Sequence, residues 1–183
     1  GYFTQYPLDI NAMVNDVEID PNNKIWLATS EGIYSFRIAG EKLVFENQIH
    51  ANKTFESIEI FAENLWVWHP EKGLSTIDTK TYEETFVSLP SDISVAKPVF
   101  SDDRGKVWLQ TNVGVLINDN ESSQFKRPSG LEEFGKLNII HVYSHQDAYW
   151  VVTENQGIFK LDKVSLTLLK QLNGLSDNAT SDI

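Results

Sequence analysis

The sequence predicts an all-β chain built from copies of one short unit, and three observations support this prediction. Four of the five tryptophans recur at intervals of 40, 42 and 42 residues, at Trp26, Trp66, Trp108 and Trp150. The residues that flank them recur with the same spacing. No segment of ten or more residues has helical periodicity. A fixed spacing of this length is typical of repeat architectures, in which each repeat is one supersecondary unit.

The same signals surround each tryptophan. A threonine stands three residues after three of them, whereas His69 takes that place after Trp66. A glycine follows each tryptophan by six or seven residues, and an apolar residue follows each glycine, at Gly32, Gly73, Gly114 and Gly157. We interpret this glycine as a turn or close-approach position at the start of a strand.

Each repeat contains four runs typical of short strands. The first precedes the tryptophan, as in 17–19, the second contains it, the third begins after the glycine, and the fourth follows another turn, as in 84–87. Turn formers such as Asp20-Pro21-Asn22-Asn23 separate the runs. Four antiparallel strands in about 42 residues are typical of a β-propeller blade. The blades are expected at approximately 14–48, 55–89, 95–127 and 137–172.

The repeated tryptophans have a structural role in this prediction. One four-stranded sheet cannot bury both of its faces, so blades stack, and a large aromatic side chain fills the layer between neighbours. We therefore expect the four tryptophans and the four glycines to be structural residues of the repeat.

Composition excludes several classes of function. The 183 residues include 26 acidic and 15 basic side chains, a net charge of −11, which disfavours binding to nucleic acid. There is no cysteine, so disulfides, thiolate metal sites and cysteine nucleophiles are excluded. No apolar run reaches the roughly 18 residues of a membrane-spanning helix, so any membrane attachment is expected through the rest of a parent protein.

The repeat resembles the two-component regulator propeller repeat. The copy at 17–36 carries Ile25-Trp26-Leu27-Ala28-Thr29 and then Gly32-Ile33-Tyr34-Ser35-Phe36, and the opening motif recurs as Gly174-Leu175-Ser176-Asp177-Asn178. The resemblance implies the periplasmic or extracytoplasmic part of a bacterial inner-membrane receptor. Hybrid histidine kinases that respond to carbohydrate are the commonest such receptors, and others end in diguanylate cyclase domains. It also implies that this segment binds or transmits a signal and is not itself the enzyme.

The ends of the sequence suggest that the repeat continues. Residues 2–6 and 178–183 are expected to be stray strands of incomplete blades, which would make the chain a segment of a larger propeller. A closed four-bladed ring is the alternative. Open fragments could instead self-associate, because an open arc exposes apolar sheet faces and unpaired strand edges.

The sequence offers little for catalysis, metals or cofactors. His141 and His145 are four residues apart, a spacing that brings two ligands together on a helix but not on a strand. The 20–23 turn supplies too few oxygens for calcium. The acidic pairs are expected to be solvated charges of turns and strand edges, at Glu83-Glu84, Asp102-Asp103 and Glu132-Glu133. We therefore expect no catalytic residue, no metal and no cofactor.

Two residues break the repeat and become candidates for ligand binding. Trp68 has no counterpart in the other copies, and His69 replaces the threonine. Since aromatic rings can stack on sugar rings, a small molecule or an oligosaccharide is the expected ligand, although Trp68 could also simply fill space. Two other functions stay open: a propeller lyase or glycosidase with its site at the axial mouth, and a scaffold that presents loops to a protein partner.

Overall fold

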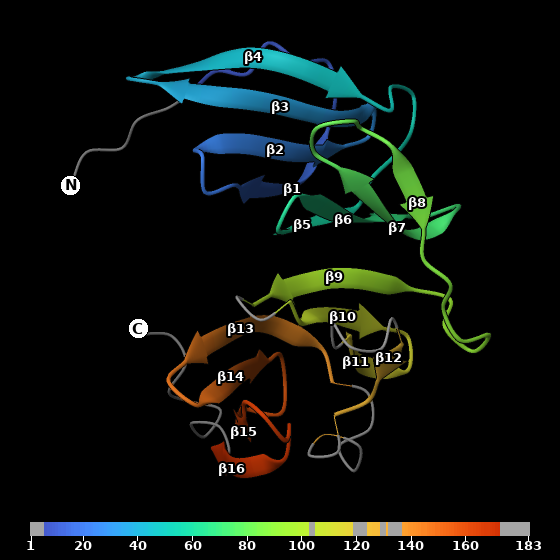
Figure 1. The fold of residues 1–183 in the computed structure, drawn as a ribbon, viewed down its shortest axis with the longest axis vertical. Helices are drawn as coiled ribbons and strands as arrows, with labels where there is room; N and C mark the ends of the chain where they lie inside the picture. Colours follow the sequence, from blue (N-terminus) through green and yellow to red (C-terminus); the bar gives the residue numbers. More distant parts are fainter. Residues whose placement is uncertain (1–5, 103–104, 119–123, 129–130, 132–136, 173–183) are drawn as a thin grey trace. The chain divides into compact units, whose positions relative to one another are not determined.

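A computed structural model of the chain describes residues 6–102, 105–118, 124–128, 131 and 137–172 (Figure 1). These residues form an all-β fold of four antiparallel four-stranded sheets, each with its strands in chain order, and contain no helix. The prediction of an all-β chain with propeller-type blades is therefore confirmed. No described segment forms a helix long and apolar enough to span a membrane. The predicted stray strands, 2–6 and 178–183, lie outside the described residues except for Tyr6, which is in no strand.

The chain divides into two compact units, residues 1–88 and 89–183, and each contains two blades. In the first unit, blade 1 consists of β1 (Val14–Ile19), β2 (Lys24–Thr29), β3 (Gly32–Ala39) and β4 (Lys42–Ile49). Blade 2 consists of β5 (Ser57–Phe61), β6 (Asn64–His69), β7 (Gly73–Asp78) and β8 (Glu84–Phe86).

The second unit repeats this plan. Blade 3 consists of β9 (Ala96–Ser101), β10 (Val107–Thr111), β11 (Gly114–Asn118) and β12 (Phe125–Lys126). Blade 4 consists of β13 (Ile139–His145), β14 (Ala148–Thr153), β15 (Ile158–Asp162) and β16 (Leu168–Leu172).

Each unit has its own hydrophobic core between its two blades. In the first unit, Trp26 and Ala28 of β2 pack in one cluster with Leu65 and Val67 of β6. In the second unit, Trp108 of β10 packs in one cluster with residues of β13, β14 and β15, and its ring centroid lies 5.1 Å from that of Tyr149. The tryptophan face of the first blade thus packs against the second blade of the same unit.

The four repeated tryptophans do not share one environment. Trp26 and Trp108 are 1% and 0% exposed, whereas Trp66 and Trp150 are only partly buried. Successive side chains of a strand point to opposite faces. Blades 2 and 4 direct the residues on either side of their tryptophan into the core of the unit, so Trp66 and Trp150 lie on the other face of the sheet.

The glycine of the repeat is needed at a tight turn. Gly32 has φ +119°, and a Cβ on it would lie 2.7 Å from the carbonyl oxygen of Ile49. Gly73, Gly114 and Gly157 also have positive φ. In three blades the repeated threonine closes this turn, since its hydroxyl donates to the glycine carbonyl at 2.7, 2.6 and 2.8 Å, from Thr29, Thr111 and Thr153.

The turns show that the structural repeat is a pair of blades. In blades 1 and 3 the first turn is closed by an aspartate that accepts a backbone N–H four residues later, at Asp20 and Asp102. Blades 2 and 4 use a shorter turn, with positive φ at Ala62 and Gln146. The turns between their third and fourth strands also match. Asp78 and Asp162 each accept hydrogen bonds from the backbone N–H groups two and three residues later.

Candidate functional site

A buried carboxylate lies at the centre of a polar cluster in blade 2. The Glu84 side chain is only 8% exposed. Its Oε1 accepts hydrogen bonds from His69 Nε2 at 2.5 Å and from Ser75 Oγ at 2.9 Å, and its Oε2 accepts one from Lys53 Nζ at 2.9 Å. Sequence reasoning expected Glu84 to be a solvated charge, and that prediction was wrong because the register of the short β8 places its side chain on the inner face.

Strand register brings these side chains to one face. Ser75 lies opposite Val67, Glu84 lies opposite Ile77, and His69 lies opposite Gly73. Val67 and Ile77 belong to the apolar core of the unit. His69, Ser75 and Glu84, which we call the blade-2 trio, therefore continue the core face of the sheet as polar groups.

The segment between β4 and β5 completes the cluster. Lys53 Nζ lies 3.3 Å from His50 Nδ1, and His50 Nε2 donates to the carbonyl of Tyr82 at 3.2 Å. The fully buried Phe55 ring lies 4.2 Å from the His69 imidazole, centroid to centroid. Lys53 thus pairs with Glu84 through charge, and Phe55 packs against His69.

Glu84 and His69, the two titratable groups of the trio, both have lowered pKa values. Burial raises the pKa of Glu84, but hydrogen bonds from Lys53, His69 and Ser75 outweigh it and lower that pKa to about 2. Burial lowers the pKa of His69, and this exceeds the opposing effect of Glu84. At neutral pH the site therefore holds an ionised Glu84 and a neutral His69 whose proton is on Nε2.

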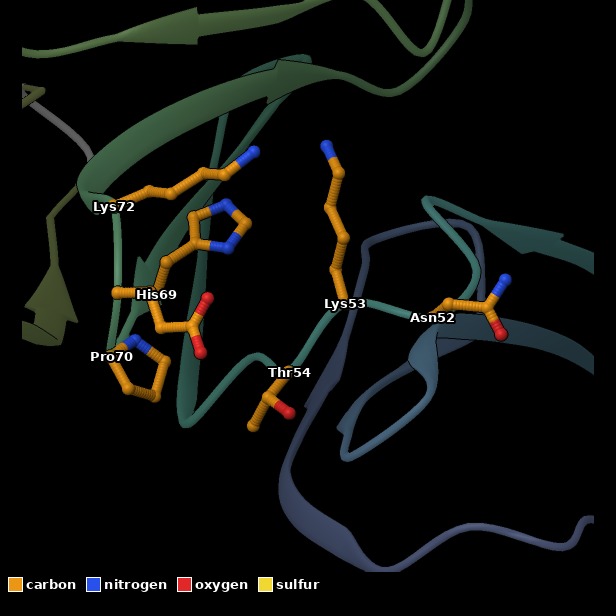
Figure 2. Close-up of a pocket in the computed structure, with 7 residues that line it drawn as sticks. Asn52, Lys53, Thr54, His69, Pro70 and Lys72 are labelled. Atoms are coloured by element: carbon orange, nitrogen blue, oxygen red, sulfur yellow. The ribbon is translucent and has the colours of Figure 1, made fainter.

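A cavity of about 340 Å³ opens beside the trio. Its lining comes from the 52–54 segment and from the turn after β6, and comprises Asn52, Lys53, Thr54, His69, Pro70, Glu71 and Lys72. Figure 2 shows the ammonium ends of Lys53 and Lys72 on the same side of the His69 imidazole. A neutral imidazole held by a carboxylate at the wall of a polar cavity can accept a hydrogen bond or a proton from a bound molecule.

The histidine at this place is a departure from the turn chemistry of the other blades. Thr29, Thr111 and Thr153 use their hydroxyls to close the turn before the glycine. His69 instead reaches Glu84 on β8. The turn in blade 2 gives up this hydrogen bond, and the side chain becomes part of the cavity wall.

Blade 4 shows that the fold does not require the trio. By strand register, Thr153, Phe159 and Leu168 hold the places of His69, Ser75 and Glu84. Phe159 is fully buried and Leu168 packs against the core of its unit. In many proteins, apolar side chains can replace buried ionic groups without loss of stability. The buried charges of blade 2 therefore contribute less to stability than well-packed apolar side chains at the same positions would.

The two residues proposed from sequence lie in different environments. His69 is 3% exposed and lines the cavity. Trp68 is 5% exposed and is not among the residues that line it. A stacking role for Trp68 stays a prediction, while His69 belongs to the candidate site. Lys53 gave no signal in the sequence.

No group of three or more histidine and acidic side chains suited to a metal ion occurs among the described residues. His141 and His145 both lie on β13.

The prediction that Asp102 is a solvated charge was wrong: it is 5% exposed, because its carboxylate closes the turn through the Lys106 N–H and accepts a hydrogen bond from the buried Tyr149 hydroxyl. Asp103 lies outside the described residues. Glu132 and Glu133 lie outside the described part of the chain.

No protein-family model matches the chain, and no curated protein matches it. Solved structures do match in fold. The extracellular domain of a protein named as a hybrid two-component system of B. thetaiotaomicron aligns with a TM-score of 0.64 and 19% identity over 87% of this chain and 23% of its own. PorZ, a component of the type-IX secretion system of Porphyromonas gingivalis, aligns with a TM-score of 0.64 and 17% identity over 87% and 27%.

A lyase has the same fold similarity. Virginiamycin B lyase from Staphylococcus aureus aligns with a TM-score of 0.63 and 13% identity over 92% of this chain and 58% of its own. At these identities the similarity establishes the fold of the chain and not its activity. This chain spans only part of each of the three matched proteins.

Proposed function

We propose that this chain is a ligand-sensing or signal-relay segment of the extracytoplasmic part of a bacterial two-component sensor. The repeat motifs and the fold similarity to the extracellular domain of a hybrid two-component system support the general role. In this proposal the parent is a membrane-bound hybrid histidine kinase, the segment lies in the periplasm, and a small molecule or a carbohydrate is the ligand.

The observation that carries the proposal is the blade-2 trio beside its cavity, with His69 as the member of the trio that lines the wall. Ser75 and Glu84 take the register positions that the apolar Phe159 and Leu168 have in blade 4, and His69 takes that of Thr153. A carboxylate, an imidazole and an ammonium group are thereby held in fixed positions beside space for a small molecule. Largely preformed polar groups at a cavity of a few hundred Å³ are typical of small-molecule sites.

A thermal-shift screen of the purified chain tests this proposal. Monosaccharides, oligosaccharides, organic acids and amino acids are added one at a time, and we expect at least one to raise the melting temperature without being converted. His69→Thr, which installs the residue of the other blades, should abolish the shift. The same substitution in the parent receptor should abolish the transcriptional response to that compound. If no compound gives a His69-dependent shift, the blade-2 cavity is not the sensing site.

An enzymatic function is the second candidate, and the His69–Glu84 pair favours it. A carboxylate-held imidazole can act as a general base, and a lyase is among the proteins with the same fold. Formation of a product from any compound of the screen, lost in His69→Thr, would replace the sensor proposal by this one.

Self-association through open blade faces is also part of the proposal. Solution mass measured over a range of concentrations checks it, and a monomer at all concentrations would contradict it.

A further inference from the structure

The cavity of blade 2 presents donors and acceptors of opposite charge. Lys53 and Lys72 contribute ammonium groups, whereas Glu71 contributes a carboxylate and His69 a ring nitrogen. The chemistry of a ligand can be deduced from how much hydrogen-bonding capacity these groups have left.

The two lysines have donor capacity to spare. An ammonium group has three N–H donors. Lys53 uses one for Glu84 and one for His50 Nδ1, which leaves one. The exposed Lys72 makes no hydrogen bond or ion pair with any residue in the described part of the chain. Figure 2 shows these two ammonium ends on the same side of the imidazole, so together they suit a carboxylate with two oxygen acceptors.

The acceptors that remain suit a protonated amine. With its Nε2 proton donated to Glu84, the imidazole of His69 has an unprotonated Nδ1, and no hydrogen bond to this atom occurs within the described residues. Glu71, the sequence neighbour of Lys72, is exposed and likewise has no partner among them. One ring nitrogen and one carboxylate thus remain to accept hydrogen bonds.

The charges around the cavity and the side chains in its wall disfavour two classes of ligand, polyanions and sugars. The lining itself holds two lysines and one glutamate, a net charge of +1 at neutral pH, and the buried Glu84 that pairs with Lys53 behind the wall brings the sum to zero. A polyanion would meet too little positive charge, particularly on a chain of net charge −11. A sugar would find only the His69 imidazole to stack on, because no tryptophan, tyrosine or phenylalanine among the described residues lines the cavity.

We propose that this cavity binds a small zwitterion with a carboxylate next to a protonated amine, as in a free amino acid. The carboxylate accepts from Lys53 and Lys72, and the ammonium group donates to Glu71 and to His69 Nδ1. The inference rests on the proposed sensing function and replaces its carbohydrate ligand by a different class.

Calorimetric titration of the full chain at pH 7.5 tests this assignment. L-Alanine, propionate, ethylamine and glucose are the probes, because the second and third each lack one charged group of the first. We expect L-alanine to bind at least tenfold more tightly than propionate or ethylamine. Propionate or ethylamine binding as tightly as L-alanine, or no binding of L-alanine, would overturn the assignment.

Three variants locate the binding. Glu71→Gln and Lys72→Met should each weaken L-alanine binding at least fivefold, whereas the exposed Lys42→Met, outside the cavity, should change it by less than twofold. Unchanged affinity in the first two variants would also overturn the proposal.

Glucose separates this inference from the proposed function. Glucose binding that His69→Thr abolishes would refute the zwitterion and leave the sensor proposal intact. If no compound of the wider screen binds in a His69-dependent way, both proposals fail.

Discussion

The two units carry the same pair of blades but fill equivalent positions differently. Both bury the tryptophan of their first blade and use the same two kinds of first turn. Opposite these buried tryptophans, the first unit has Glu18 where the second has Phe100. On the core face of the second blade, the first unit has the blade-2 trio where the second has Thr153, Phe159 and Leu168.

This difference separates what the fold requires from what a site requires. Positions that agree between the units, such as the buried tryptophans, are the ones that the blade pair needs for packing. At these three positions the second unit has two apolar side chains and a threonine, whereas the first buries a hydroxyl, a carboxylate and an imidazole. Four predictions test this comparison, from the largest expected effect to the smallest.

The shared core positions should respond alike in the two units. Trp26→Ala and Trp108→Ala each remove a fully buried aromatic side chain and should lower the free energy of unfolding by about 4 kcal/mol. Trp66→Ala and Trp150→Ala, on partly buried side chains, should cost clearly less. Urea titrations of the four variants measure this. Equal losses at all four positions would contradict the distinction between the first and second blades.

Removal of one member of the trio should lower the stability of the protein. Glu84→Leu alone leaves Lys53 and His69 without their carboxylate and should lower the free energy of unfolding by about 3 kcal/mol at pH 7. The matched control is Glu83→Leu, next to it on an exposed side chain, which should change stability by less than about 0.5 kcal/mol. Similar values for the two variants would show that Glu84 is not held as described.

Acid should weaken the first unit through Glu84. Its pKa is about 2 in the fold against 4.5 as the ordinary value, so its contribution is complete above pH 4.5 and is lost as the pH falls from 4.5 through 2. The shift corresponds to at most about 3 kcal/mol. Unfolding free energies of wild type and Glu84→Leu, measured between pH 6 and 2.5, should converge on acidification. A constant difference between them would contradict the prediction.

Glu18 should weaken the first unit as the pH rises, whereas Glu84 weakens it as the pH falls. Burial, with the nearby charges of Glu59 and Asp16, raises its pKa from 4.5 to about 7. A group whose pKa is raised in the fold contributes stability that is complete below pH 4.5 and is lost as the pH rises through 7.

Glu18→Gln should therefore be more stable than wild type at pH 8 and closer to it at pH 4. The exposed Glu31→Gln serves as the control and should follow wild type at both values. An unchanged stability difference between Glu18→Gln and wild type at the two pH values would refute the raised pKa.

The blades were predictable because their signals are local. Trp26 and Gly32 each belong to one strand or one turn, and their spacing is sufficient to predict four antiparallel strands. The burial of each tryptophan was not predictable, since it depends on which face of a blade meets its neighbour. Trp66 and Trp26 look alike in sequence, yet only Trp26 belongs to the core.

The candidate site was predictable only where it breaks the repeat. His69 stands out because the other copies have threonine there. Glu84 does not, because β8 has only three residues and the run Glu83-Glu84 reads as a solvated pair. An alignment of the blades in pairs would have revealed it, since Leu168 holds the same register position in blade 4.

The most direct test of the central claim is to transplant the blade-4 residues into blade 2. The variant Phe55→Ile/His69→Thr/Ser75→Phe/Glu84→Leu installs the blade-4 residues. Ile139 is the counterpart of Phe55, because they stand three residues before the equivalent Val142 and Ile58, respectively. Lys53, at 32% exposure, can turn to solvent. Urea unfolding at pH 7 should give a free energy within about 1 kcal/mol of wild type or higher. A loss as large as that of Glu84→Leu alone would show that the fold requires the trio.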